Sequence, residues 1–555
     1  MSFDLTGDKR IPLWLALLPI VVLIGLLVVN VQIYSDEASY GPNQIALLMA
    51  AASAAIVGWS LRIRFQEMLD GINRSIGSAL SAMLILLMIG SLIGTWMISG
   101  IVPAMIYYGL QILNPKIFLF AAVAVCSIVS VATGSSWSTV GTVGVALLGI
   151  GQALGISPAM TAGAIISGAY FGDKISPLSD TTNLASAMAG AELFTHVKYM
   201  LLTTVPSILI TLGVFLAIGF SNDGVAPAGQ TDVLLQSIDK TFNLTPILFI
   251  VPAIVFFMVI TKVDAVVALF TGTVLGGIFA IIFQPQVITI IAKLPEVAIE
   301  QSEAASNVGG TSATRPQNYV KRSYVAFMNA LTYETSIVPA DEIEAMEEEL
   351  KTKKLESARS QTNNPGLTSE QFADSKIELT ESFPELQGKI AAAGLMKGKG
   401  MIGMLNTIWL IICAMCFGGV MEACGLLQRI TVSLIQFAQS TGSLIATTAG
   451  SCIFVNLTAS DQYLSTVVPG RMFRETFQDR GLAPENLSRT LEDSGTVTSV
   501  LVPWNTCGAF QAATLGIATF TYAPYCLFNW ISPLMTIFFG FVGIKIAKFN
   551  TNAKD

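Results

Sequence analysis

The sequence predicts an all-α polytopic membrane protein with about ten to twelve transmembrane helices, some of them discontinuous, and a cytoplasmic insert. The composition is the first observation behind this prediction, because 53% of the 555 residues are hydrophobic and only 12% are charged. The second is a series of nearly uncharged windows of about 20 residues, the length that crosses a bilayer core. The third is a charged segment that separates two apolar parts.

The apolar windows define two membrane halves, residues 1–300 and residues 401–555. The first window is too long for a signal-peptide core and has no small-residue cleavage site, so we expect a retained first helix. The windows cover residues 11–31, 76–99, 197–220, 246–260, 265–283, 401–423 and 522–546.

Residues 301–400 hold much of the charge, mixed in sign and with few apolar runs, which predicts a cytoplasmic insert or linker. Its stretch "DEIEAMEEELKTKKLESARS" (341–360) is typical of a solvated helix. Glu347 precedes Lys351 by four residues and Glu349 precedes Lys353 by four, the favoured order for helix ion pairs. A regulatory or partner-binding role is the alternative. We expect the basal activity of the membrane part to survive removal of most of residues 305–390.

The distribution of basic residues predicts the orientation, since cytoplasmic loops carry the excess of Lys and Arg. Lys9 and Arg10 precede the first window, and Arg62 and Arg64 lie in the second loop. Lys545 follows the last window. Both termini are therefore expected in the cytoplasm.

Two short strings suggest an internal duplication. Both "GSSWSTVGTV" (134–143) and "SDQYLSTVVP" (460–469) contain Ser-Thr-Val after an aromatic residue. The aromatic residue directly precedes Ser-Thr-Val in the first string, and one residue separates them in the second. Further along, each half reaches an acidic, hydroxyl-rich patch broken by Gly or Pro, at residues 171–183 and 491–508. Related halves whose interrupted helices meet near the midplane are typical of transporters.

The first patch predicts a cation site. A carboxylate in the hydrocarbon layer costs several kcal/mol, so Asp173 and Asp180 should face a cavity, a partner or an ion. Pro177 lies between them and interrupts a regular helix. An all-oxygen set without His or Cys suits Na⁺ and suits zinc or copper poorly, so no cofactor is expected. The neutral oxygens nearby belong to Ser176, Thr181, Thr182 and Asn183.

Other polar residues in apolar surroundings extend this set, each with an alternative. Asp461 is expected in the gap of a second broken helix or as a helix cap. Asp493 is favoured over Glu492 as an ion ligand, although both could form surface salt bridges with Arg489. The candidates for proton or ion coupling are Glu422, Glu492, Thr139, Ser136 and Asn505.

Two cationic or titratable neighbours could change this picture. Lys174 either pairs with Asp173, which would leave Asp180 as the stronger ligand, or stays available. His196, the only histidine, is expected at the membrane interface, with a pH sensor as the alternative. Glu422 could equally be an interfacial acid near the end of a span.

The site chemistry indicates exchange by competition. Burial raises the pKa of an aspartate from about 3.9 toward neutral, and a bound cation lowers it again. A group that holds either H⁺ or Na⁺, but not both, must release one ion to load the other. An intramembrane aspartyl enzyme is disfavoured, because Asp173 and Asp180 stand seven residues apart across a proline. A passive channel is disfavoured because buried carboxylates at helix breaks indicate occluded binding.

Four strings together resemble the NhaC family of sodium/proton antiporters: "ATGSSWSTVGT", "SGAYFGDKISPLSDTTNLA", "FGGVMEACGLL" and "LEDSGTVTSVLVPWNTCGAF". The resemblance covers most of residues 10–300 and 400–545. It implies a protein of the bacterial inner membrane that exchanges Na⁺ for H⁺, built from two inverted repeats with discontinuous helices. The lipid bilayer and the two ions are the expected partners, with no nucleic acid, and a homodimer stays open.

Members of very similar sequence exchange malate and protons for lactate and sodium, so a sodium-coupled organic-acid exchanger is the alternative function. It would need a cationic or donor-rich cradle for the substrate carboxylate. The groups that could form this cradle are Lys174, the "TGSSWST" hydroxyls and the N-termini of broken helices.

Overall fold

A computed structural model describes residues 11–34, 38, 41–221, 230–292, 314–362, 364, 368, 383–436 and 438–548. Lys9 and Arg10, used above for the orientation, lie outside these ranges. Within them the regular structure is helical except for one short antiparallel pair of strands, β1 (Thr335–Ser336) and β2 (Lys397–Gly398), and one isolated bridge. The predicted all-α polytopic class is confirmed.

Seven helices in the described ranges are long and apolar enough to cross a membrane, and each predicted apolar window falls on helices. The count rises to nine if two bent pairs are single spans, with bends of 90° and 58°. It stays below the expected ten to twelve, and three further helices in the described parts of the two membrane halves reach 18 residues but are too polar to be counted: Pro158–Ile175, Thr441–Thr458 and Gln462–Asp479. The seven are α1 (Leu13–Tyr34), α2 (Pro42–Ser60), α3 (Phe65–Ile98), α5 (Pro115–Thr133), α10 (Leu193–Ser221), α13 (Ala265–Phe283) and α20 (Ile402–Ala423).

The shorter elements fall into three groups. The bent pairs are α11 (Gln230–Thr241) with η3 (Pro246–Phe249) and α12 (Ile250–Ile260), and α26 (Thr519–Tyr522) with η6 (Ala523–Tyr525) and α27 (Leu527–Val542). The first half adds α4 (Ile101–Ile112), α6 (Ser136–Thr139), η2 (Val140–Gly144), α7 (Val145–Ala153), α8 (Pro158–Ile175), α9 (Asp180–Ala189) and α14 (Pro285–Ile291). The insert and second half add α16 (Thr314–Thr332), α17 (Ala340–Thr362), α19 (Pro384–Leu395), α21 (Leu426–Ile435), α22 (Thr441–Thr458), α23 (Gln462–Asp479), α24 (Pro484–Leu491), η4 (Glu492–Thr496), η5 (Ser499–Leu501) and α25 (Thr506–Leu515).

The two halves repeat one order of elements in opposite directions. The series α3, α4, α5, α6–α7, α8–α9, α10 returns as α20, α21, α22, α23, α24–α25, α27. The equivalent helices α3 and α20 are antiparallel, because Gly71 lies against Gly419 while Gly90 lies against Gly400. The start of α10 lies beside the end of α27, where the Tyr199 hydroxyl donates to the Lys545 carbonyl at 2.6 Å. The repeats are therefore inverted, as the resemblance implied.

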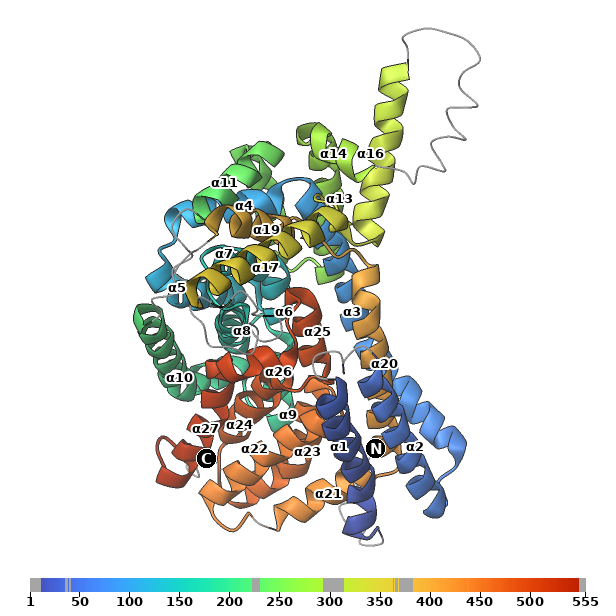
Figure 1. The fold of residues 1–555 in the computed structure, drawn as a ribbon. Coiled ribbons are helices and arrows are strands. Elements are labelled where there is room, and N and C mark those ends of the chain that lie inside the picture. Colours follow the sequence, from blue (N-terminus) through green and yellow to red (C-terminus); the bar gives the residue numbers. More distant parts are fainter. Residues whose placement is uncertain are drawn as a thin grey trace.

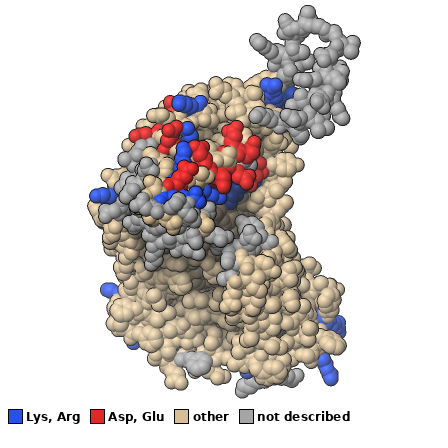
Figure 2. Space-filling view, viewed as in Figure 1, with Lys and Arg blue, Asp and Glu red and all other residues tan. Residues whose placement is uncertain are grey.

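The charged helix of the insert forms as predicted. Lys353 pairs with Glu349 at 2.7 Å, but Lys351 lies 3.7 Å from Glu348 rather than beside Glu347. The partners at three and four residues are both within reach on a helix surface, so the spacing alone does not choose between them. Acidic and basic side chains gather at this end of the molecule (Figure 2), above a surface that is mostly uncharged.

The insert is more closely joined to the membrane helices than a loose loop would be. The Ser91 hydroxyl of α3 donates to the Leu331 carbonyl at 3.0 Å, and the ring of Phe327 lies against Gly277 of α13. A Cβ at Gly94 would come within 2.0 Å of the Ala330 carbonyl, so α16 packs directly on the backbone of α3. Removing residues 305–390 would therefore also remove a packing helix, contrary to the picture of a separate aqueous insert.

The insert and the termini lie at opposite ends of the membrane helix α20 (Figure 1). Gly400, at the end of the insert, precedes α20 directly. At the other end of α20, Arg429 donates to the carbonyl of Ile11 at 2.7 Å. Lys548, the last described residue, forms a β-bridge with Leu482 between α23 and α24. The C label of Figure 1 lies at the same end of the molecule as α21 and α22. Since α20 is long and apolar enough to cross a membrane, this arrangement favours opposite sides for the insert and the termini, whereas the sequence analysis expected all of them in the cytoplasm.

Candidate cation-binding site

Four helix breaks meet in the middle of the protein. Gly134, between α5 and α6, lies against Leu178 and Ser179 in the gap between α8 and α9. Its φ of +66° is left-handed, and a Cβ there would come within 2.7 Å of Leu178 Cβ, so this turn requires glycine. In the second half, the Thr506 amide at the start of α25 donates to the Ser460 carbonyl between α22 and α23 at 2.9 Å.

A cavity of about 590 Å³ opens at this junction. Its wall contains four carboxylates and several hydroxyl groups, and no Lys, Arg or His side chain is among the described residues that line it. The lining comes from both halves and from α3 and α13: Ser78, Ala79, Ser81, Ala82, Ile85, Gly134, Ser135, Ser136, Trp137, Asp173, Leu178, Asp180, Asp264, Ala265, Asp461, Gln462, Tyr463 and Thr506.

The two aspartates of the first patch lie on either side of the α8–α9 break. Asp173 is buried and accepts a 2.7 Å hydrogen bond at Oδ2 from the Ser136 hydroxyl. Asp180 is exposed to the cavity and accepts a 2.5 Å hydrogen bond at Oδ2 from the Tyr463 hydroxyl. Asp173 is thus held by α6 of the first half, and Asp180 is held by α23 of the second half.

Asp461 is both at a break and a helix cap, the two options that the sequence left open. Its Oδ1 accepts hydrogen bonds from the Tyr463 and Leu464 amides at 2.8 and 2.9 Å, which satisfies the free amides at the start of α23. Asn505 caps α25 in the same way, through the Cys507 amide at 3.1 Å. These caps fix the second-half break around the cavity.

The neutral polar residues of the first patch mainly satisfy the backbone of the break. The Ser176 hydroxyl donates to the Val131 carbonyl at 2.8 Å, and the Thr182 hydroxyl donates to the Lys174 carbonyl at 2.9 Å. Asn183 donates to the Ser179 carbonyl at 2.6 Å. These side chains therefore donate hydrogen bonds to backbone carbonyls that a broken helix leaves unpaired. The Thr181 hydroxyl is 3.0 Å from Ser179 Oγ, and the Thr139 hydroxyl donates to the Ser135 carbonyl at 2.9 Å.

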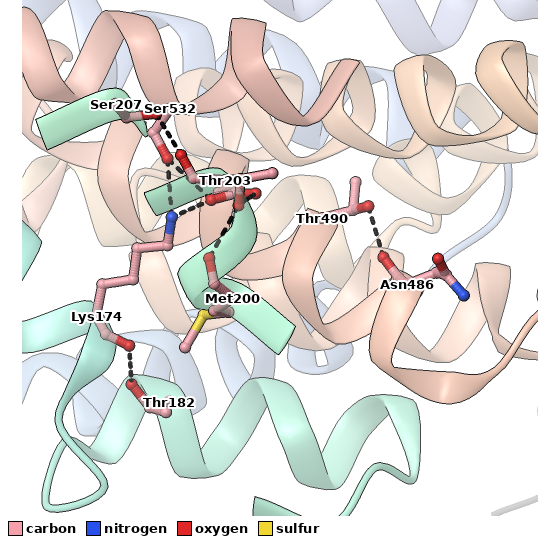
Figure 3. A network of polar contacts seen from close by, with 9 residues as sticks. Lys174, Thr182, Met200, Thr203, Ser207, Asn486, Thr490 and Ser532 are labelled. Atoms are coloured by element: carbon pink, nitrogen blue, oxygen red, sulfur yellow. Dashed lines mark hydrogen bonds and ion pairs between the residues drawn. The ribbon is translucent and has the colours of Figure 1, made fainter. Parts of the chain in front are cut away.

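Lys174 pairs with Asp493 and not with Asp173. Figure 3 shows Lys174 reaching toward Ser532 and Thr203. Its ammonium contacts the Asp493 carboxylate and donates to Ser532 Oγ at 2.9 Å, and the second oxygen of Asp493 accepts from the Thr203 hydroxyl at 2.9 Å. Both charged side chains are fully buried. The expected pairing with Asp173 is wrong because Lys174 follows Asp173 directly in α8 and so points to another side of the helix. The cation that neutralises Asp493 is therefore Lys174, a side chain of the protein itself.

Three other candidates lie away from the cavity wall. Glu492 is fully buried, so a surface salt bridge with Arg489 does not form. His196 is also fully buried, with Nδ1 2.7 Å from Ser488 Oγ, so it packs inside the protein, and its expected depth at the membrane interface stays a prediction. Glu422 is exposed at the end of α20. Among the described residues, no three His, Cys, Asp or Glu side chains gather in a way that could hold a metal ion.

Sequence reasoning missed Asp264. This residue caps α13 through the Val266 amide at 2.9 Å and lines the cavity. Ser78 and Ser81 of α3 were missed for the same reason, because α3 and α13 lie outside the recognisable patches. The signal for Asp264 was a single acid between two apolar windows, residues 246–260 and 265–283.

Two inverted halves, with an acidic cavity where their interrupted helices meet, define a secondary active transporter. The sequence matches the Na⁺/H⁺ antiporter family over residues 168–294 and 383–544. The chain is 32% identical to the Na⁺/H⁺ antiporter NhaC of Alkalihalophilus pseudofirmus over 541 residues, which cover 98% of each chain. The protein belongs to the Na⁺/H⁺ antiporter family, and it is a membrane transporter rather than an enzyme.

Two further relatives carry other names. The chain is 29% identical to the malate-2H⁺/Na⁺-lactate antiporter of Bacillus subtilis, over 97% of this chain and 96% of the relative. It is also 29% identical to the arginine/ornithine antiporter ArcD of Halobacterium salinarum, over 98% of this chain and 94% of the relative. At this similarity the fold is shared while the transported substrates differ.

Proposed function

We propose that the protein exchanges Na⁺ for H⁺ across the membrane, with the carboxylates of the central cavity as the shared binding groups. The observation that carries this proposal is the wall of the cavity. Asp173, Asp180, Asp264 and Asp461 contribute negative charge, and no basic side chain is among its described lining. Oxygen-rich, anionic surroundings favour a hard cation.

Competition for these carboxylates would couple the two ions. Several like charges around one cavity repel one another, so at low Na⁺ concentration protons neutralise some of them. When Na⁺ enters, it replaces the protons, which leave to water on the same side. The inverted halves would then expose the loaded site to the other side, as alternating access requires.

The cavity wall argues against a dicarboxylate as substrate. A carboxylate would need a cationic partner, and Lys174, the piece expected for that role, is already committed to Asp493. A second candidate function, exchange of a basic amino acid, fits the cavity wall better than dicarboxylate transport does. A cavity of about 590 Å³ exceeds the needs of a bare ion, and its negative charge would attract a basic amino acid.

We also propose that the termini are cytoplasmic and that the insert lies on the opposite side of the inner membrane. Short basic loops support this orientation. Arg62, Arg64, Arg429 and Arg480 lie at or near the end of the bundle that holds the termini.

Proton movement in proteoliposomes after a Na⁺ pulse tests the proposed exchange. Flux on Na⁺ alone would support it. Flux only in the presence of malate and lactate would replace it with organic-acid exchange, and flux only with arginine and ornithine would replace it with amino-acid exchange. No proton movement under any of these conditions would contradict the proposal.

A further inference from the structure

A second cavity, of about 270 Å³, lies between the helices of the first half. Among the described residues it shares no lining with the acidic cavity, and no charged side chain lines it. Its wall comes from α3, α4, α5, α6, η2, α12 and α13. The atoms around a void of this size lose packing contacts, so an occupant of matching chemistry would stabilise the surrounding helices.

The polar groups of this wall are mostly paired within the protein. Trp96 Nε1 donates to the Gly272 carbonyl at 3.1 Å, and the Thr142 hydroxyl donates to the Ser138 carbonyl at 2.7 Å. The Thr133 hydroxyl lies 3.4 Å from two backbone carbonyls of its own segment. Water or an ion therefore has little to bind there, whereas an apolar cavity readily takes an apolar guest.

The cavity opens toward the outer surface between α5 and α12. Val129 and Phe256 line it, and the residues next to them, Ile128 and Phe257, are 70% and 66% exposed. Ala253 of α12 both lines the cavity and is exposed, which places the mouth there. α5 is long and apolar enough to cross a membrane, and α12 belongs to a bent pair of that kind. Apolar side chains exposed on such helices contact lipid chains, because the bilayer core holds no water.

The inner wall of this cavity is the segment that separates it from the acidic one. α6 and η2 follow each other without a break. Ser136, at the start of α6, lines the acidic cavity and donates to Asp173 at 2.7 Å. Ser138, Thr142 and Val143 line the apolar cavity. An occupant of the apolar cavity would therefore pack against the segment that holds the Asp173 carboxylate.

We propose that the apolar cavity binds one acyl chain of a bilayer lipid, which enters between α5 and α12 and packs against the α6–η2 segment. The wall offers no charge to a headgroup among its described residues, and the mouth lies between helices whose exposed faces are apolar. The bound chain fills the void and supports the position from which Ser136 reaches Asp173. This inference goes beyond the proposed exchange, and it holds for any substrate of the acidic cavity.

The test uses the full-length protein in liposomes that contain a phospholipid with a photoreactive diazirine in its acyl chain, followed by peptide mapping. Ile128 and Phe257 serve as positive controls, because both are exposed on the outer surface. We expect label on Thr142 and Val143 as well, since these residues form the inner wall of the cavity. Label on Ile128 and Phe257 without label on the α6–η2 segment would overturn the proposal, and this comparison needs no variant.

A pair of neighbouring substitutions on α12 sharpens the test. A253F should lose the label on Thr142 and Val143, because the new ring occupies the mouth. I254F is the matched control, since Ile254 is exposed on the same helix but does not line the cavity. Equal labelling of the inner wall in the two variants would contradict entry at this mouth.

The unfolding temperature in detergent gives an independent readout. Added phospholipid should raise it more in the wild type and in I254F than in A253F, whose own ring already occupies the site. Equal rises in all three proteins would contradict a bound chain in the cavity. None of these measurements uses ion flux, so a failure of the lipid site and a failure of the proposed exchange are distinguishable.

Discussion

The Tyr463 hydroxyl donates a 2.5 Å hydrogen bond to Asp180 Oδ2 and so joins the hairpin of the second half to the broken helix of the first. Tyr463 follows Asp461, whose carboxylate caps α23, and Asp180 begins α9. This hydrogen bond thus connects the break before α23 with the break before α9, at Asp180, a carboxylate that lines the cavity. If the halves move relative to each other during transport, this contact is one that has to break.

We predict that D180N abolishes exchange while the protein still inserts, because the amide cannot carry the negative charge that attracts Na⁺. Y463F should keep the charge and lower the rate. Proton flux after a Na⁺ pulse in proteoliposomes measures both. D239N is the control, since Asp239 is exposed on α11 away from the cavity. Normal flux in D180N would contradict the role of Asp180.

The buried pair of Lys174 and Asp493 gives a prediction about stability. K174M should lower the free energy of unfolding by about 3 to 5 kcal/mol, because it leaves Asp493 charged and unpaired in the protein interior. The double variant K174M/D493L should recover part of that loss, since it removes both charges. Thermal unfolding in detergent compares the three proteins. A double variant less stable than K174M would show that the pair stabilises the fold beyond mutual neutralisation.

Gly134 gives a prediction about the turn between α5 and α6. G134A should destabilise the protein and slow exchange, because left-handed backbone costs an ordinary residue about 1 to 2 kcal/mol and the new Cβ would come within 2.7 Å of Leu178 Cβ. G213A is a matched control, since a Cβ at this helical glycine of α10 meets nothing within 4 Å. Unfolding temperature and flux should stay at wild-type values or rise in G213A. Equal behaviour of the two variants would contradict the argument.

The cost of a carboxylate in an apolar window singled out Asp173, Asp180 and Asp461 in the sequence, and all three line the cavity. The acids of the second patch, Glu492 and Asp493, do not line it. The sequence could not predict partners that depend on three-dimensional packing. Lys174 next to Asp173 suggested a pair, yet its partner Asp493 is 319 residues away in the chain.

The side of the insert likewise depends on more than local patterns. Apolar windows and the Ser-Thr-Val echo indicated the membrane halves and their duplication, since both are local patterns. The side of the insert depends on the number and direction of all preceding crossings. α8 has 18 residues but contains Asp173 and Lys174, and α9 has only 10, so neither formed an apolar window and this count was not available from the windows. Mixed charge in residues 301–400 gives no preference for either side.

The proposed orientation predicts which segments a membrane-impermeant thiol reagent reaches in intact cells. E348C in α17 should be labelled from outside, because we place the insert there, whereas R64C should be labelled only after the membrane is opened. Both side chains are well exposed, at 73% and 85%. The seven native cysteines provide little background, because six are buried and Cys416 is partly buried. The reverse pattern of labelling would place the termini outside.

Competition between the ions predicts how Na⁺ dependence changes with pH. When the shared carboxyl groups are mostly protonated, Na⁺ must displace protons to bind, so the apparent KM for Na⁺ should rise as pH falls. Displacement of one proton raises KM by about tenfold for each unit of pH, and displacement of two raises it more steeply. Initial rates of proton flux at several pH values give this slope. A KM that does not change with pH would contradict competition at a shared site.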